Sequence, residues 1–174
     1  MWGMPTNGCK IPGDMERDCI LLDTSFFIRL LNDQDPLHNN AMGYYRYFLE
    51  KGYILKMSTI SVAEYCVKGA LDELPLRDVQ VLPFNIHHAE KAGKLAAIVF
   101  QNRESLNLND RKIIPNDTKL FAQADAEAQI NKFATSDEAC IKIYNLLKGN
   151  IGLTFDIINI RRPYHETFGM LDLQ

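Results

Sequence analysis

The stretch from Cys19 to Leu31, CILLDTSFFIRLL, is the feature that most constrains the fold. Four apolar residues, enough for a short buried strand, end at Asp23, and an apolar helical pattern begins at once through Thr24 and Ser25. The same succession recurs along the chain, and strands that alternate with helices predict a parallel sheet covered on both faces. We therefore expect an α/β protein, a three-layer α/β/α sandwich with a central, mainly parallel sheet. The further strands are predicted at residues 53–58, 79–84, 132–136 and 155–160.

The segments between these strands carry apolar residues at helical spacing, so each predicted strand is connected to the next by at least one helix. In sheets of this kind the functional crevice lies beyond the carboxyl ends of the strands. The predicted helices cover residues 24–31, 41–51, 60–71, 86–103, 116–130 and 137–149.

Length and composition indicate one domain. A chain of 174 residues with 47% hydrophobic content can bury a core of its own. We expect a loosely ordered N-terminal extension at residues 1–17, a folded domain at 18–160 and a C-terminal tail at 161–174. The net charge of -3 excludes a global basic field, although a local basic patch can still lie beside an acidic site.

The four cysteines are widely spaced and form no C-x-x-C pair, and two of them lie in apolar runs. This pattern is typical of reduced, buried thiols and predicts a cytoplasmic protein. The N-terminus lacks the apolar segment of a signal peptide, and no run of 18 apolar residues occurs, so we expect no membrane span.

Acidic residues stand where the predicted strands end and the helices begin. Asp23 follows the first strand, Asp117 opens a helix, and Asp137 follows the strand at 132–136. Glu64 is expected in the first turn of the helix at 60–71. If the strands are parallel neighbours, the four side chains converge at one edge of the sheet.

Each acid also has a purely structural explanation. Asp23 and Asp137 suit helix caps, Asp117 suits a first turn, and Ser61 with Glu64 fits the S-x-x-E capping box. A helix start needs only one cap, however, and four acids in one crevice would repel one another. Such a cluster is best explained by hard divalent cations, Mg²⁺ or Mn²⁺, which prefer oxygen ligands and can promote phosphodiester hydrolysis.

The four acids lie in sequence blocks that resemble the PIN domain, a family of metal-dependent ribonucleases that includes the VapC-type toxins of toxin–antitoxin pairs. The blocks occur in the family's order, and Phe121 and Cys140 depart from its usual pattern. The resemblance covers roughly residues 18–160, and the matching blocks are LLDTSFFI, MSTISVAEY, NDTKLFAQADA and FATSDEA.

The resemblance implies a Mg/Mn-dependent endoribonuclease that hydrolyses RNA phosphodiesters. Asp23, Glu64, Asp117 and Asp137 would be the catalytic and metal-binding residues. The family further implies a homodimer and, for a toxin, an antitoxin protein as partner. Two residues would orient the acids through hydrogen bonds, Ser25 and Thr135.

Positive charge near the acids would hold an RNA substrate. Arg103, Arg111 and Lys112 are the main candidates, with Arg161 and Arg162 behind them. Most such side chains are nonetheless ordinary solvated surface residues.

Three other groups have simpler explanations than a functional site. The pair His87 and His88 fits an exposed first helical turn, and Asp33 and Asp35 fit a turn before a helix. The aromatic residues of the helix at 41–51 suit the core or a dimer interface better than base stacking. These aromatic residues are Tyr44, Tyr45, Tyr47 and Phe48.

Two other functions stay open. One is a non-catalytic PIN-like module that binds RNA or protein, with the acids serving only as caps. The other is an aspartyl-phosphate phosphatase, whose nucleophile also follows the first strand. That chemistry needs a second acid two residues later, where this chain has Ser25.

Overall fold

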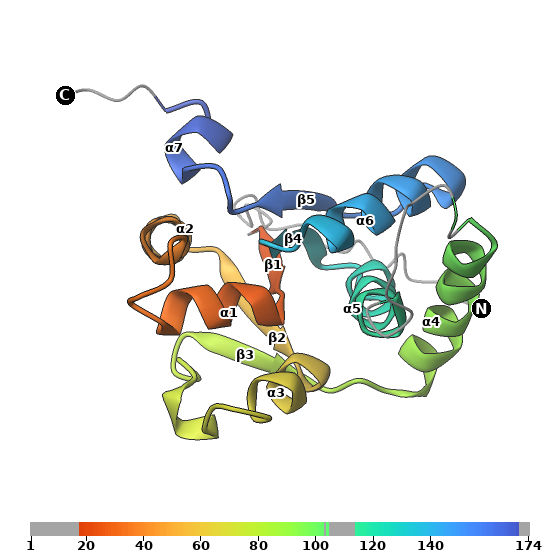
Figure 1. Ribbon diagram of the computed structural model, residues 1–174, viewed down its shortest axis with the longest axis horizontal. Helices are drawn as coiled ribbons and strands as arrows, with labels where there is room; N and C mark the ends of the chain where they lie inside the picture. Colours follow the sequence, from red (N-terminus) through yellow and green to blue (C-terminus); the bar gives the residue numbers. More distant parts are fainter. Residues whose placement is uncertain (1–17, 103, 105–113, 171–174) are drawn as a thin grey trace, which may run out of the picture.

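A sheet of five parallel strands forms the centre of the molecule in the computed structural model, which describes residues 18–102, 104 and 114–170. The strand order is β3-β2-β1-β4-β5, and every neighbouring pair is parallel (Figure 1). The predicted α/β class and parallel sheet are confirmed. The strands are β1 (Cys19–Leu22), β2 (Ile54–Ser58), β3 (Val79–Leu82), β4 (Ile130–Thr135) and β5 (Asp156–Asn159).

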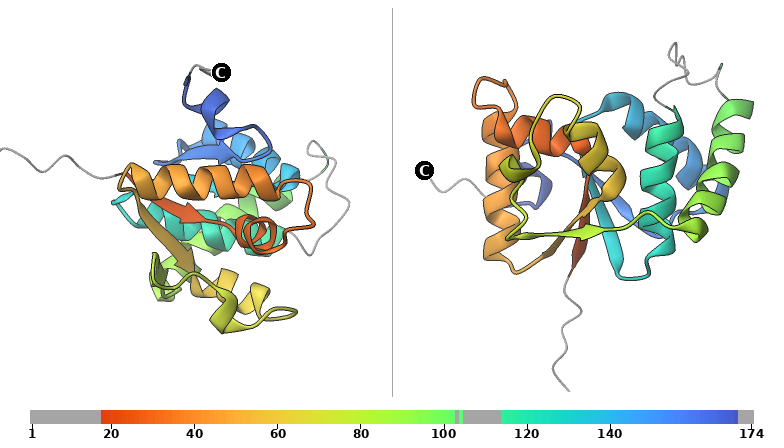
Figure 2. Two further views of the ribbon diagram at one scale, coloured as in Figure 1. Left: turned by 90° about the vertical axis from the view of Figure 1, so that its left-hand side faces the viewer. Right: turned by 90° about the horizontal axis from the view of Figure 1, so that it is seen from below.

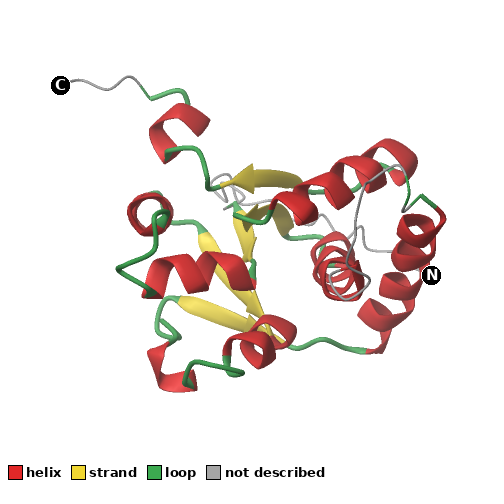
Figure 3. Ribbon diagram, in the orientation of Figure 1, coloured by secondary structure: helices red, strands yellow, loops and turns green. Residues whose placement is uncertain are grey.

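Helices cover both faces of the sheet and complete the three layers (Figure 3). One face packs against α1 (Thr24–Leu31) and α2 (His38–Glu50). The other packs against α4 (Ile86–Gln101), α5 (Ile114–Ala126) and α6 (Glu138–Ile151). Three short elements complete the described chain: α3 (Thr59–Tyr65), the 3₁₀ turn η1 (Leu71–Glu73) and α7 (Tyr164–Thr167).

The central strand β1 is buried on both faces. Cys19 and Leu21 join the core under α4, α5 and α6, whereas Ile20 and Leu22 join the core under α1 and α2. Each of the four is at most 1% exposed. A strand with two buried faces must be apolar at every position, which is why CILL is an uninterrupted apolar run.

Aromatic rings fill the core between the sheet and the three helices α4, α5 and α6. Phe121 lies at 5.1 Å from Phe133, between ring centroids, and also contacts Tyr144 and Phe155. Phe121 and Phe155 are fully buried. The departure from the family pattern at position 121 is therefore a large side chain that fills the core.

The predicted helix at residues 60–71 is too long, because α3 begins at Thr59 and already ends at Tyr65. Beyond it the chain turns so closely that a Cβ atom on Gly69 would stand 2.4 Å from the ring of Tyr65. A side chain at position 69 would therefore require the Tyr65 ring to shift. The helix predicted at 116–130 is also too long at its end, since α5 ends at Ala126 and β4 begins at Ile130.

The aromatic side chains of α2 belong mainly to the core of this chain. Tyr44 and Phe48 are fully buried, and the Tyr44 hydroxyl lies 2.5 Å from that of Thr167 in α7. Phe168, just after α7, stacks on Tyr47 at 4.5 Å. Residues from the predicted tail thus pack beside α2 (Figures 1 and 2).

Cys19 and Cys140 are buried, Cys66 is exposed, and all three are free thiols. Within the described part of the chain, no helix combines the length and the apolar character that crossing a lipid bilayer requires.

The aromatic core gives a stability prediction. We expect Phe121→Ala to lower the free energy of unfolding by about 3–5 kcal/mol, because it removes a buried ring and leaves a cavity. The control is Ile86→Ala, at a side chain that is 77% exposed, and its change should stay within about 0.5 kcal/mol. Urea denaturation of both variants measures the difference, and equal losses would contradict the assigned packing.

Candidate functional site

The four acids singled out from the sequence line one pocket at the carboxyl ends of the strands. Asp23 follows β1, Asp137 follows β4, Glu64 belongs to α3 and Asp117 to the first turn of α5. The cavity has a volume of about 350 Å³. Strand order explains the convergence, because β1 lies between β2 and β4 and all three point the same way. The other residues that line the pocket are Thr24, Ser25, Ile28 and Asn116.

Hydrogen bonds fix the Asp23 carboxylate at the carboxyl end of β1. One carboxylate oxygen accepts a hydrogen bond from the Thr24 amide at 2.7 Å, so Asp23 also caps α1. The other accepts hydrogen bonds from the Ser25 and Thr135 hydroxyls, each at 2.7 Å. Burial raises the pKa of Asp23, and these hydrogen bonds oppose that rise by stabilising the carboxylate.

Ser25 and Thr135 join the ends of β1 and β4. Besides their bonds to Asp23, the Ser25 hydroxyl accepts from the Ser136 amide and the Thr135 hydroxyl accepts from the Asp137 amide, each at 3.0 Å. Both side chains therefore contact the acid they were expected to orient. Their influence on a bound metal stays a prediction.

Asp117 is the least satisfied acid of the pocket. It is 8% exposed, and its buried Oδ2 atom has no hydrogen-bond partner in the described part of the chain. Burial raises the pKa of Asp117 to about 8, with further contributions from the negative charges of Asp23, Asp137 and Glu64. Burial, followed by the negative charges of Asp117, Asp23 and Asp137, raises the pKa of the Cys140 thiol well above its ordinary value. The pocket therefore favours an added positive charge.

Glu64 and Asp137 differ from their sequence-based descriptions in one respect each. Glu64 lies in the last turn of α3, and the capping box assigned to Ser61 and Glu64 is wrong, because Ser58 caps this helix. Asp137 lines the pocket and also caps α6, accepting from the Ala139 and Cys140 amides. A helix cap and a pocket acid are therefore not exclusive alternatives here.

Sequence analysis missed two polar side chains, Thr24 and Asn116, both of which donate hydrogen bonds to Glu64. Their only signal in the sequence is that each adjoins a candidate acid, Asp23 or Asp117.

The donor set suits a hard divalent cation, although the side chains as placed are not gathered around one point. Among the described residues, no group of three or more His, Cys, Asp or Glu side chains is arranged to hold a metal ion. Mutual repulsion spreads carboxylates apart, and three of the four here take hydrogen-bond donors instead. The unpartnered Oδ2 of buried Asp117 and the all-oxygen chemistry of the pocket nevertheless fit Mg²⁺ or Mn²⁺.

A family model described as PIN domain matches residues 20–146. This chain belongs to the PIN domain family. The match covers most of the chain and includes all four acids. No curated protein matches it significantly.

Solved structures share the fold of this PIN domain. A chain of VapBC2 from Rickettsia felis, bound to a DNA fragment from their promoter, is 19% identical; 81% of this chain and 98% of that chain are covered, with a TM-score of 0.56. DNA-bound VapBC from Salmonella typhimurium is 16% identical, with 82% of this chain and 98% of that chain covered and a TM-score of 0.49. VapC20 of Mycobacterium tuberculosis, a toxin that cleaves the sarcin-ricin loop, is 22% identical, with 70% of this chain and 92% of that chain covered and a TM-score of 0.45. At this level of identity, the likeness to VapBC2 concerns the fold alone.

The predicted phosphate contacts of the PIN domain are only partly covered by the structure. Arg103, Arg111 and Lys112 lie outside the described residues. Arg161 follows β5 at the same sheet edge as the acids, and its Nε atom donates to the Ser136 carbonyl at 2.7 Å. The same atom lies 3.7 Å from Glu138, so the guanidinium group contacts the residues on either side of Asp137 in the sequence.

Two other assignments can be compared with the structure. Asp35 lies in a turn before α2, as expected, and accepts from the Leu37 amide; it also pairs with Arg29. His88, in contrast, is not a surface residue. It is 2% exposed, accepts from the Asn85 amide and lies 3.0 Å from Glu127, so it ties α4 to the end of α5.

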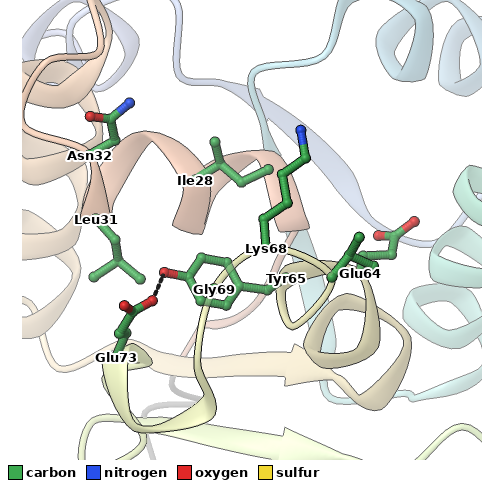
Figure 4. A pocket seen from close by; sticks show the side chains of 9 residues that line it. Ile28, Leu31, Asn32, Glu64, Tyr65, Lys68, Gly69 and Glu73 are labelled. Carbon is green, nitrogen blue, oxygen red and sulfur yellow. Dashed lines mark hydrogen bonds between the residues drawn. The ribbon is translucent and has the colours of Figure 1, made fainter.

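A second, more apolar groove of about 710 Å³ adjoins the acidic pocket and shares Ile28 and Glu64 with it (Figure 4). It lies between α1 and the segment that follows α3. Ile28 and Leu31 are 45% and 38% exposed, and Val67 is 77% exposed. The Tyr65 hydroxyl donates to Glu73 across one end of the groove, at 2.8 Å.

The raised pKa of Asp117 predicts how stability depends on pH. An acid with a folded-state pKa of about 8 and an unfolded value of about 4 binds its proton more tightly when folded. Its contribution to stability is complete below pH of about 4 and is lost as the pH rises through about 8. Without metal, we expect Asp117→Asn to melt about 5 °C above wild type at pH 8 and to lose most of this advantage at pH 5.

Asp125→Asn is the matched control. Burial alone would raise the pKa of Asp125, but hydrogen bonds from Lys91 and Thr154 hold it below its ordinary value. This substitution should therefore lower the melting temperature at pH 8. Calorimetry in EDTA at both pH values measures the two variants, and destabilisation by Asp117→Asn at pH 8 would contradict the electrostatic description of the pocket.

Proposed function

We propose that this PIN domain is a metal-dependent endoribonuclease that hydrolyses RNA phosphodiesters in its acidic pocket. The observation that carries the proposal is the convergence of Asp23, Glu64, Asp117 and Asp137 on one cavity, with a buried oxygen of Asp117 left unpartnered. Segments far apart in the sequence supply these acids, so helix capping alone does not explain their meeting.

The four acids would hold one or two Mg²⁺ or Mn²⁺ ions. Asp23 is the most rigid of them, because it is buried and three donors fix its two oxygens. Ser25 and Thr135 leave that carboxylate little freedom to turn, which favours one coordination geometry. Asp117 contributes the oxygen that has no donor among the residues the structure describes.

When bound, the cation supplies positive charge that acidifies a water molecule and neutralises charge on the scissile phosphate. Positively charged side chains near the pocket would position the phosphate for this reaction. Arg161 is anchored to the Ser136 carbonyl, one residue before Asp137, and is suited to contact a phosphate near the pocket. Arg103, Arg111 and Lys112 remain candidate contacts to the RNA.

The alternative is a PIN-like module that binds RNA or protein without cleaving it. In that case the acids serve only as caps and first-turn residues, as Asp23 and Asp137 do in part. Divalent metal separates the two functions, because a ligand that binds the folded state stabilises it. The phosphatase alternative is disfavoured by Ser25, whose hydroxyl donates to Asp23 where that chemistry needs a second acid.

We further propose a toxin of a toxin–antitoxin pair, with an antitoxin protein that covers the groove beside the pocket. The groove supports this through its exposed apolar side chains, Ile28, Leu31 and Val67, and its continuity with the acidic site. The homodimer and the cytoplasmic location expected from the sequence belong to the same proposal. Tyr44 and Phe48 are buried within the chain, so a dimer contact would have to use other residues.

The nuclease proposal predicts metal-dependent cleavage. Wild type should cleave unstructured RNA in Mn²⁺ or Mg²⁺ and lose this activity in EDTA. Asp117→Asn should lose at least a hundredfold in rate, because it removes a charged ligand. Asp125→Asn, at an acid outside the pocket, should retain its activity. Gel analysis of labelled RNA measures the cleavage rate of all three proteins. If wild type cleaves no RNA and added metal does not raise its melting temperature, the binding module is favoured.

The groove predicts where a partner binds. The probe is the product of the reading frame next to this gene, co-expressed with the chain and recovered with it by affinity purification. Val67→Glu should reduce co-purification at least tenfold, because it places a charge in an apolar contact. Ile86→Glu is the matched control, since both side chains are 77% exposed and Ile86 lies on α4. Equal recovery with both variants would contradict the assignment.

A further inference from the structure

The carboxylate of Glu64 is held from two sides by side chains of other elements. The Thr24 hydroxyl, in the first turn of α1, donates to Oε2 at 2.5 Å. The Asn116 amide nitrogen, in the first turn of α5, donates to Oε1 at 2.5 Å. Both oxygens of one carboxylate are thereby fixed by residues 40 and 52 positions away in the chain.

Asn116 is itself oriented by a third residue. Lys119 Nζ donates to the Asn116 side-chain oxygen at 3.3 Å. A lysine ammonium can only donate, so the amide turns its oxygen toward Lys119 and its nitrogen toward Glu64. The contact with Lys119 therefore fixes the orientation in which the Asn116 amide meets Glu64.

Glu64 needs such support because of where it lies. It belongs to α3, a helix of seven residues, and its side chain is half-buried with three rotatable bonds. Ordering a long side chain of this type costs conformational entropy, which the two hydrogen bonds offset. A carboxylate offers about four lone pairs, so two donors still leave positions for a cation.

We propose that Thr24 and Asn116 are positioning residues that hold Glu64 in place to receive a divalent cation. This rests on the proposed function and adds two residues that the four-acid description leaves out. Neither residue needs to touch the cation or the RNA, because each acts through the carboxylate of Glu64. Residues that orient metal ligands in this way commonly contribute 10–100-fold in metal affinity.

The test is calorimetric titration of Mn²⁺ into the full chain, without RNA. Thr24→Val and Asn116→Ala should each lower Mn²⁺ affinity at least tenfold, and Thr24→Ser should restore near wild-type binding. The matched control is Thr154→Val, because the Thr154 hydroxyl also donates to a carboxylate, that of Asp125, but outside the pocket. Its Mn²⁺ affinity should equal that of wild type.

The double variant Thr24→Val with Asn116→Ala tests whether both act on the same group. Because each holds one oxygen of a single carboxylate, we expect the double variant to bind within about threefold of the weaker single variant. If the loss of Mn²⁺ affinity in the double variant equals the product of the two single losses, a shared action through Glu64 is overturned. Melting temperatures without metal identify any variant whose folding is impaired, and Asn116, which is less buried than Thr24, offers the milder substitution.

The outcomes separate this proposal from the proposed function. If wild type binds Mn²⁺ and Asp117→Asn does not, while both single variants bind like wild type, the positioning role is overturned and the metal site stands. A lower melting temperature with unchanged Mn²⁺ affinity would likewise overturn it, since the role would then be structural. If wild type binds no Mn²⁺, the proposed function fails and the positioning role fails with it.

Discussion

The parallel pairing of β1 with β4 is the constraint on which the rest of this structure depends. It places Leu22 opposite Ala134, so that Asp23 and Thr135 follow side by side at the carboxyl ends of the two strands. The Asp23 amide donates to the Ala134 carbonyl at 3.0 Å, and the Thr135 hydroxyl donates to the Asp23 carboxylate. The helices on both faces of the sheet bury β1, and the same burial removes Asp23 from water.

Burial and mutual repulsion both disfavour the charged form of the carboxylates in the pocket. Burial raises the pKa of both Asp23 and Asp117; hydrogen bonds oppose the rise at Asp23, whereas the charges of Asp23, Asp137 and Glu64 add to burial and bring the pKa of Asp117 to about 8. Proteins rarely leave a buried carboxylate oxygen unpartnered without a functional reason. A divalent cation would relieve the repulsion without adding a proton, and the proposed nuclease chemistry follows from that need. The capping roles of Asp23 and Asp137 show that the site is part of the helix starts themselves.

The apolar groove beside the pocket gives a second surface to the same edge of the molecule. Its side chains come from α1 and from the turn after α3, the segment where the expected helix ends early at Tyr65. Val67, in this turn, is 77% exposed, and Gly69 lies against the Tyr65 ring. The end of α3 and the groove are therefore built from the same short segment.

The alternation of apolar strands with helical segments determined the fold class, and the acids at the junctions identified the candidate site, because both patterns are local in sequence. The apolar run of β1 and the blocks around the four acids are of this kind. Tertiary structure alone decided that Phe121 fills an aromatic core, that His88 is buried, and that Thr24 and Asn116 hold Glu64. These contacts join residues 40 or more positions apart or depend on strand order, and no local periodicity records them. The sequence thus determined which groups stand at the strand ends, whereas the tertiary structure decided which of them meet, because that depends on the order in which the strands pair.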